Sequence, residues 1–375
     1  RPLWYAKNEE TPEDNYSYKY QNWYPAAERE SNSTRNNVSL FELTPFAKFE
    51  LNGKEAHKEL QTICSNNISK NKGKTTYTQM LNKYGGIEAD LSVTCLEEDS
   101  FLITTGSAVR YHDKHWIEKN INIQSNVRLN DVTEKYSVIG IMGPNSRSLL
   151  SSLSSDNFET MEFPFGTGKN ITVKNKKVWA QRLSYVGELG WELFIPTEDA
   201  LEIYNVIIDA GKKFDLMHAG THTMDILRME KGYLHWGHDI SPEENPYQVG
   251  LQMFVSLKKS ENFIGRKAME SMHKNECNKR LVYLTLEKEN NPGNPLLLHE
   301  EPIYMNNKIV GKTSSGQYSF NYKKSMSMGH ITLKEKFKLS DIENNKFEIE
   351  VAKKRYEAKM NLQPLHDPKN ILIKK

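Results

Sequence analysis

A single carboxylate in an otherwise regular strand pattern is the first residue that could do chemistry. Residues 87–95 alternate strictly between apolar and polar side chains, and Asp90 lies in the middle of the polar face. Aspartate is depleted in strands, and a partly desolvated carboxylate is a good general base. Asp90 is therefore our candidate catalytic residue. The same pattern also fits a solvated outer face on which Asp90 only meets water, and the pattern alone leaves both interpretations open.

A neighbouring segment supplies two polar partners for this carboxylate. Residues 75–81 have the composition of a strand, and residues 83–86 end in two glycines, which tolerate the positive φ angles of a tight turn. A hairpin with this turn places Gln79 opposite Asp90 and Tyr77 diagonal to Asp90 on the same face. A tyrosine hydroxyl beside a carboxylate forms a candidate acid–base pair, so Tyr77 joins Asp90 as a predicted catalytic residue.

Two histidines resemble part of a metal site. His235 and His238 are three residues apart, with Gly237 between them and Asp239 next in the chain. No distant third ligand is evident, so the sequence predicts no metal site and favours a structural or binding role for the pair. Which of these roles the two histidines have stays open.

Composition narrows the class of protein. The chain has 375 residues, of which 37% are hydrophobic and 26% charged, which is typical of a soluble globular protein of two or three domains. The 50 basic and 48 acidic residues nearly cancel, so a nucleic-acid partner is not expected. The apolar runs are too short to span a bilayer, so no membrane association is expected.

The cysteines and the glycines exclude further classes. Cys64, Cys95 and Cys277 are odd in number and far apart, which argues against a disulfide framework and favours a reducing compartment. No Gly-x-Gly-x-x-Gly motif follows a strand, so any dinucleotide-binding fold lies outside this chain.

Further elements must position these side chains. Residues 101–105 complete an antiparallel meander with the hairpin. Residues 198–213 predict an amphipathic helix with an apolar face of Leu201, Tyr204, Ile207 and Ile208. Other expected strands are residues 137–142, 171–178, 179–183 and 191–195, and other expected helices are residues 115–121, 145–153 and 223–231, the last ending at Gly232.

The chain divides into three parts. Residues 1–37 show little periodicity and carry four aromatic side chains that must pack against something, namely Trp4, Tyr5, Trp23 and Tyr24. We interpret them as a connector lying against a neighbouring domain, with a plain linker as the alternative. Residues 38–275 form an α+β domain, and the short strands of residues 280–372 are typical of a small barrel or sandwich. The opening residues have no initiator Met or leader and read like the middle of a longer chain.

An ordered set of motifs carries a resemblance to a known family. Three segments resemble core motifs of the glycine-cleavage T-protein (aminomethyltransferase) family: YTQMLN with GGIEADL at residues 77–91, SYVGELGWE at residues 184–192, and DILRMEKG at residues 225–232. HWGHDI at residues 235–240 and FIGR at residues 263–266 are similar to the folate-binding C-terminal half of dimethylglycine and sarcosine dehydrogenases. Each motif is weak alone, but the set spans nearly the whole chain in order.

This resemblance implies an architecture and an activity. The fold would be an α+β folate-binding domain with antiparallel sheets and helices, followed by a small C-terminal β-barrel, with residues 1–37 ending a flavoprotein middle domain. The chain would transfer the one-carbon unit of a methylated amine, as an iminium or formaldehyde, to tetrahydrofolate and give methylene-tetrahydrofolate. FAD would bind only in an N-terminal flavin domain outside this chain. The compartment would be the cytoplasm, or the mitochondrial matrix in a eukaryote.

The resemblance also implies roles for individual residues. Asp90 matches the family's catalytic aspartate, which acts on a reactive folate nitrogen, and Tyr77 matches the tyrosine beside it. Tyr185 and Glu192 match residues of the pterin pocket, with Glu192 accepting hydrogen bonds from the pterin amino and ring N–H groups. Arg228 matches an arginine of the same pocket.

Two rival interpretations remain. The first is a stand-alone folate-dependent aminomethyltransferase or demethylase. However, the glycine-cleavage form usually has two adjacent acids where this chain has Ala89 and Asp90, which favours the dehydrogenase branch. The second is a non-catalytic relative similar to the regulatory subunit of pyruvate dehydrogenase phosphatase, against which the presence of Asp90, Tyr77 and Glu192 speaks.

Overall fold

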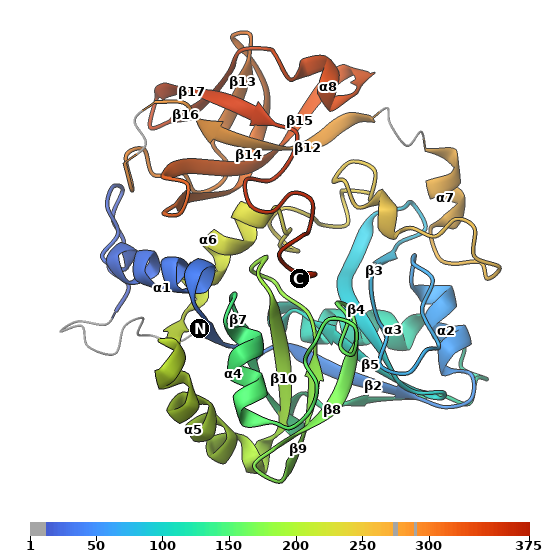
Figure 1. Cartoon of the computed structure of the whole chain (residues 1–375). Helices are drawn as coiled ribbons and strands as arrows, with labels where there is room; N and C mark the ends of the chain where they lie inside the picture. The colour runs from blue at the N-terminus through green and yellow to red at the C-terminus, as the bar shows by residue number, and fades with distance from the viewer. Residues whose placement is uncertain (1–12, 273–276, 289–290) are drawn as a thin grey trace.

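Two β-sheets and a closed β-barrel make up the structure. The computed structural model describes residues 13–272, 277–288 and 291–375, so Trp4 and Tyr5 lie outside the described residues. In Figure 1 the barrel lies above the two sheets. The predicted α+β class with a C-terminal barrel is confirmed. Within the described residues, no helix is long and apolar enough to cross a membrane.

The five-stranded sheet carries the predicted hairpin. Its strand order is β3-β4-β5-β2-β6, and its bounds are β2 Ala47–Asn52, β3 Thr75–Leu81, β4 Ile87–Glu97, β5 Ser100–Thr105 and β6 Arg128–Asp131. The helices α2 (Ala56–Ile63) and α3 (Arg110–Asn120) contribute to the core on one face of this sheet, which also buries Ala89, Leu91 and Val93 of β4. The antiparallel meander is therefore confirmed, and Asp90 points to the opposite face.

The six-stranded sheet has the order β11-β1-β7-β10-β9-β8 and is antiparallel except for the β1–β11 pair. Its bounds are β1 Ser39–Glu42, β7 Tyr136–Met142, β8 Gly168–Val173, β9 Lys176–Gln181, β10 Gly190–Pro196 and β11 Met217–Ala219. Helices α4 (Ser146–Leu153) and α5 (Ala200–Gly211) cover its outer face.

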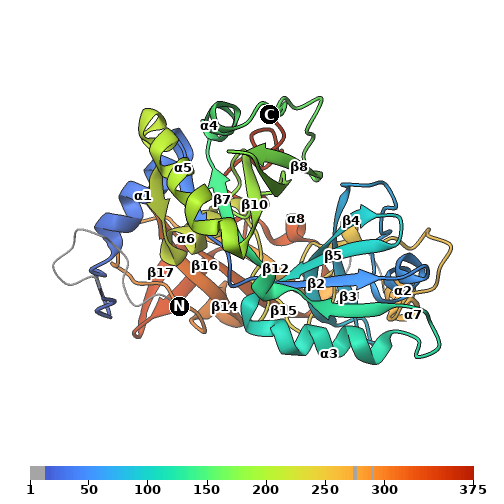
Figure 2. The same cartoon turned by 90° about the horizontal axis from the view of Figure 1, so that it is seen from below.

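The inner faces of the two sheets share a core. Phe41 of β1 and Phe194 of β10 belong to the same buried cluster as Leu102 of β5. Figure 2 views the molecule from the side of the sheets, with the barrel beyond them. Side chains on the inner faces of β4 and β10 therefore point into the region between the sheets.

Two local predictions were wrong. Leu201 is 73% exposed, because α5 buries Ile203 and Ile207, one turn apart, and turns its first residues to solvent. Residues 171–178 are not one strand: the chain reverses at Lys174 and Asn175, which have φ angles of 46° and 65°. Such paired positive φ angles are typical of a two-residue hairpin turn, and asparagine favours them.

The N-terminal segment contains a helix that its sequence did not predict. α1 spans Tyr24–Asn36 and packs against α6 and β11. Its buried side chains include Ser31 and Thr34, so the usual apolar stripe is absent from the sequence pattern. Trp23 and Tyr24 are buried, which confirms that these two aromatic side chains pack against the protein.

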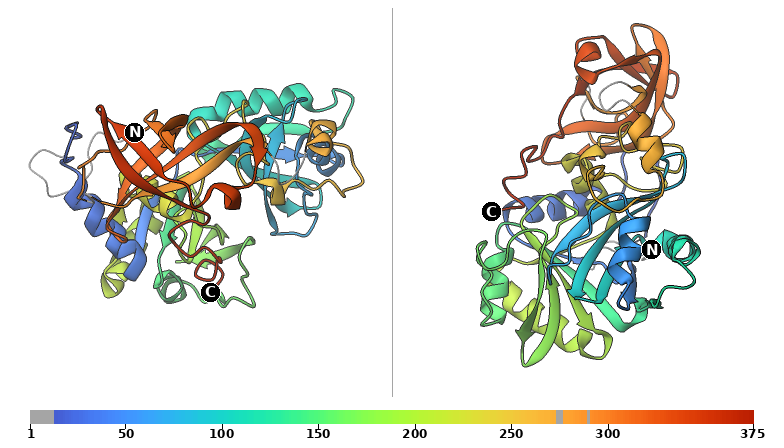
Figure 3. Two further views of the ribbon diagram at one scale, coloured as in Figure 1. Left: turned by 90° about the horizontal axis from the view of Figure 1, so that it is seen from above. Right: turned by 90° about the vertical axis from the view of Figure 1, so that its right-hand side faces the viewer.

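The C-terminal strands form a closed barrel, which decides between the barrel and the sandwich. Its order is β12-β15-β14-β13-β16-β17, and its bounds are β12 Cys277–Leu286, β13 Pro302–Met305, β14 Lys308–Ser319, β15 Lys324–Phe337, β16 Phe347–Val351 and β17 Lys354–Asn361. The sequence did not predict β17, because only Ala358 and Met360 of its residues are buried. The right-hand panel of Figure 3 shows the barrel stacked at one end of the sheets.

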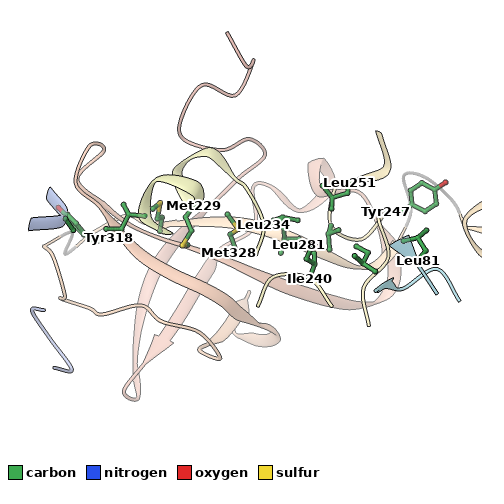
Figure 4. Close-up of a cluster of buried hydrophobic side chains, with 14 of the residues drawn as sticks. Leu81, Met229, Leu234, Ile240, Tyr247, Leu251, Leu281, Tyr318 and Met328 are labelled. Atoms are coloured by element: carbon green, nitrogen blue, oxygen red, sulfur yellow. The ribbon is translucent and has the colours of Figure 1, made fainter. Parts of the chain in front are cut away.

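Helix α6 (Thr221–Lys231) and the segment after it join the barrel to the sheets. One apolar cluster runs from Tyr318 and Met328 of the barrel, past Met229 of α6, to Leu81 of the hairpin. Figure 4 shows these side chains as a continuous row. α6 ends as predicted at Gly232, which has a φ angle of 74°.

We predict that Gly232→Ala destabilises the protein by more than the ~1–2 kcal/mol that a left-handed conformation costs an L-residue. A Cβ atom at this position would also lie 3.0 Å from Pro364 and 3.1 Å from the Tyr283 hydroxyl. Thermal unfolding measures the loss. Gly237→Ala is the matched control, since its φ is 90° but nothing lies within 4 Å of its Cβ. Equal losses in the two variants would contradict the crowding at Gly232.

Candidate functional site

Asp90 lies on the inner face of β4, opposite Gln79 of β3. The Gln79 side-chain amide donates a hydrogen bond of 2.8 Å to Asp90 Oδ1, and the Tyr77 hydroxyl lies close enough to this carboxylate to lower its pKa. The predicted register is therefore confirmed. Gln79 is fully buried and Thr94, on the same face of β4, is 1% exposed, so this face is not a solvated outer surface.

Burial changes the acidity of both groups. Burial raises the pKa of the Asp90 carboxyl to about 6, against the opposing effects of Gln79 and Tyr77, and the charge of Asp113 adds to the rise. Burial and the Asp90 charge also raise the pKa of the Tyr77 hydroxyl well above its ordinary value. Asp90 is thus mostly ionised at neutral pH and is a stronger proton acceptor than an exposed aspartate.

Aromatic side chains surround this pair. The ring of Phe254 lies edge-on to Tyr77, with 4.7 Å between ring centroids. The Tyr185 ring stacks on Tyr233 at 6.0 Å, and the Tyr185 hydroxyl donates a 2.9 Å hydrogen bond to the carbonyl oxygen of Leu234. Tyr185 is close enough to Tyr77 to influence its pKa. Phe254, which ends the short 3-10 helix Gln252–Phe254, was not predicted as part of the site.

Arg228 does not present a free guanidinium group. It is 2% exposed, and it forms ion pairs with Asp225 at 2.8 Å and with Asp239 at 2.5 Å. Its Nη2 atom also donates to the Ser315 hydroxyl of the barrel at 2.9 Å, and its Nη1 donates to the Tyr233 carbonyl at 3.1 Å. Arg228 therefore belongs to a buried network that also holds the backbone of Tyr233, whose ring stacks on Tyr185.

Asp239, which directly follows His238 in the chain, connects this network to the barrel. Its carboxylate accepts hydrogen bonds from the hydroxyls of Ser314 at 2.5 Å and Ser315 at 2.8 Å. Although burial acts to raise it, Arg228 and these serines hold the pKa of Asp239 below its usual value. This role could not be predicted from the sequence, because the partners of Asp239 lie 75 and 76 residues further along the chain.

The two histidines lie at the surface beside this network. The rings of His235 and His238 are 4.6 Å apart, and both residues are exposed. Although much of the His235 side chain reaches solvent, partial desolvation of its ring and the nearby Arg228 lower its pKa. In the part of the chain that the structure describes, no group of three metal-ligating side chains occurs.

Glu192 lies on β10 of the other sheet, and no charge among the described residues contributes to its pKa shift. It is 9% exposed, and burial alone raises its pKa to about 7. Among the described residues, no hydrogen bond or ion pair to its carboxylate is formed. A buried carboxylate without a donor is destabilising, so this position favours a ligand that offers hydrogen-bond donors.

A direct contact brings the two sheets together near these carboxylates. The side-chain amide of Gln181 in β9 donates a 3.0 Å hydrogen bond to the Thr94 hydroxyl of β4. Gln181 is the register partner of Glu192, and Thr94 lies four residues along β4 from Asp90, a distance of ~13 Å at 3.3 Å per residue. Glu192 and Asp90 therefore bound the same region between the sheets.

Comparisons with known proteins agree with this architecture. A family model described as the GCVT N-terminal domain matches residues 1–259, and one described as the glycine cleavage T-protein C-terminal barrel domain matches residues 279–367. The glycine cleavage system aminomethyltransferase T from Bartonella henselae superposes with a TM-score of 0.79 at 21% identity, over 91% of this chain and 90% of that chain, which shows the shared fold.

Two relatives are similar in sequence to most of this chain. Human mitochondrial dimethylglycine dehydrogenase is 33% identical over 368 residues, which cover 97% of this chain but 41% of that protein. The chain thus spans about two fifths of the length of the dehydrogenases it matches. The aminomethyltransferase of Halothermothrix orenii is 32% identical over 310 residues, covering 82% of this chain and 84% of that protein. With both family models matched in order, the chain belongs to the glycine cleavage T-protein (aminomethyltransferase) family.

Proposed function

We propose that this chain binds tetrahydrofolate between its two sheets and transfers a one-carbon unit to it, as the folate-binding half of an FAD-dependent N-methyl amine dehydrogenase. The observation that carries the proposal is the pair of carboxylates on facing sheets, Asp90 and Glu192, neither of which has a cationic partner among the described residues. One of them can bind the ring of a folate and the other can accept its proton.

Glu192 fits the aminopyrimidinone edge of a reduced folate. That edge presents a ring N–H and an amino group side by side, and a carboxylate can accept one hydrogen bond from each. Binding offsets the cost of burying the Glu192 charge without a partner. The aromatic side chains of Tyr185 and Tyr77 supply flat apolar surface for the bicyclic ring.

Asp90 is the proposed general base of the transfer. A folate nitrogen attacks the carbon of an iminium or of formaldehyde, and the Asp90 carboxylate takes the proton that this nitrogen releases. The protonated Asp90 returns this proton to the departing amine, or to the hydroxyl group that leaves the formaldehyde adduct as water. The second folate nitrogen then attacks the same carbon, and Asp90 takes up its proton as the ring of methylene-tetrahydrofolate closes. Gln79 holds the carboxylate in place through its hydrogen bond, and Tyr77 lies beside it. Proximity of the two reactants supplies a large part of the gain.

Arg228 and Tyr185 act in this proposal as positioning residues. Arg228 holds the Tyr233 carbonyl and Asp239, and Tyr185 stacks on Tyr233. The network therefore fixes the positions of Tyr233 and Tyr185, against which the pterin ring would rest. Arg228 itself makes no charged contact with the ligand in this proposal.

The oxidation of the amine is assigned to a flavin domain beyond this chain. The chain spans 41% of the human dehydrogenase that it resembles, and its sequence contains no dinucleotide-binding glycine motif. A stand-alone aminomethyltransferase is the second candidate, which the match over 84% of the Halothermothrix orenii protein favours. A flavin absorbance spectrum in the full-length natural protein distinguishes the two.

We expect Asp90→Asn to lower capture of the one-carbon unit by ~10²–10⁴-fold, the usual contribution of a general base. The variant keeps the shape of the side chain and an acceptor for Gln79. The full-length protein would be supplied with tetrahydrofolate and with dimethylglycine or sarcosine, and methylene-tetrahydrofolate and free formaldehyde measured together. Amine oxidation should continue while formaldehyde escapes.

Glu88→Gln is the matched control for this prediction. Glu88 lies two residues from Asp90 on the same face and is hydrogen-bonded to Asn82 at 3.0 Å, so the same carboxyl-to-amide change should leave capture unaltered. Unchanged capture by Asp90→Asn, above the uncatalysed reaction, would rule out Asp90 as the base.

We also expect the affinity for tetrahydrofolate to fall as the pH is lowered through neutrality. Glu192 must be ionised to accept two hydrogen bonds, and burial raises its pKa to about 7. Its ionised fraction therefore falls about tenfold between pH 8 and pH 6, and the measured affinity should fall by about the same factor. Anaerobic calorimetric titration at several pH values measures this.

The control is Glu192→Gln, which has no carboxyl group to ionise. Its affinity should be low and nearly independent of pH in this range, whereas Asp90→Asn should retain the full pH dependence of binding. A pH dependence that survives in Glu192→Gln contradicts the assignment of Glu192.

A further inference from the structure

Gln181 is a second buried acceptor beside Glu192. It ends β9 and is fully buried. Its amide nitrogen donates to Thr94, but its Oε1 atom has no hydrogen-bond partner among the described residues. A buried amide oxygen without a donor is uncommon, because leaving such a group unsatisfied is destabilising.

The Gln181 side-chain oxygen lies beside the Glu192 carboxylate. Gln181 and Glu192 are register partners across β9 and β10, so their side chains project from the same face of the sheet. Neither the Glu192 carboxylate nor the Gln181 amide oxygen receives a donor within the described residues. The two carboxylate oxygens of Glu192 and the Oε1 atom of Gln181 therefore form a group of three buried acceptors on the same face of the sheet.

We propose that Gln181 is a specificity-determining residue, whose Oε1 atom accepts a hydrogen bond from the exocyclic amino group of an aminopyrimidinone ring. This inference rests on the proposed folate site and deepens it. The ring edge offers three N–H bonds, two on the amino group and one on the ring nitrogen. The two Glu192 oxygens and the Gln181 oxygen supply three acceptors, so the numbers of donors and acceptors match.

This pairing selects against ligands that lack the amino group. Such a ligand leaves Gln181 and one Glu192 oxygen without a donor, and sites built to hydrogen-bond a polar group reject analogues without it. The competing explanation is that Gln181 only ties the sheets together through Thr94, or only supports Glu192. In either case its removal would affect ligands with and without the amino group alike.

The test is anaerobic calorimetric titration of the full-length natural protein with tetrahydrofolate and with its 2-desamino analogue. Gln181→Met keeps the length of the side chain and removes the acceptor. We expect this variant to bind tetrahydrofolate about tenfold more weakly, the usual effect of losing a buried hydrogen bond. Because Gln181→Met also loses the bond to Thr94, its affinity for the 2-desamino analogue should fall only by the factor that Thr94→Val shows.

Two further variants keep the result interpretable. Thr94→Val removes the contact between the sheets but not the acceptor, so it should shift both affinities by the same factor. Gln181→Glu retains an acceptor and should still discriminate between the two ligands. Thermal unfolding of each variant checks that it is folded.

Equal weakening of both ligands by Gln181→Met, or no weakening of either, overturns the inference and leaves the folate site standing. No binding of tetrahydrofolate by the unchanged protein is a separate result. It overturns the proposed function itself and, with it, the ligand assigned to Gln181.

Discussion

The burial of two carboxylates, with no cation to neutralise them in the part of the chain that the structure describes, is the constraint on which the site depends. Asp90 accepts a hydrogen bond from Gln79 and lies beside Tyr77, and burial raises its pKa to about 6. Glu192, on the facing sheet, has no partner among the described residues and a pKa of about 7. Burial is the largest cause of both rises, and the charge of Asp113 adds to the rise at Asp90.

The buried Arg228 does not neutralise either carboxylate, because its charge is already paired. Arg228 pairs with Asp225 and Asp239, and the barrel contributes Ser314 and Ser315 to the same network. The guanidinium charge is therefore used to join α6 to the barrel. This division of charges keeps Asp90 a strong proton acceptor and leaves Glu192 free for a donor-rich ligand, as the proposed function needs.

The hairpin could be predicted from the sequence because its information is local. Gln79 and Asp90 are 11 residues apart, and strand alternation with a two-glycine turn fixes their register. The contact between Gln181 and Thr94 joins residues 87 positions apart and depends on how two sheets pack. No periodicity in either strand contains that information, so Gln181 was not singled out.

The errors have similar physical causes. α1 buries small polar residues such as Ser31 and Thr34 and so lacks an apolar stripe. The buried face of α5 is centred on Ile203 and Ile207, so Leu201 could not be placed without knowing which turn meets the sheet. The partners of Arg228 could not be predicted for a related reason, because Asp239 and Ser315 come from other parts of the chain.

The most direct test of the account is an experimental structure of the full-length natural protein with bound tetrahydrofolate, prepared without oxygen. The account predicts the pterin ring between the sheets, its amino edge within ~3 Å of Glu192 and a reactive nitrogen within hydrogen-bond reach of Asp90, directly or through one water. A folate that binds elsewhere on the chain, or with its amino edge turned away from Glu192, would contradict it.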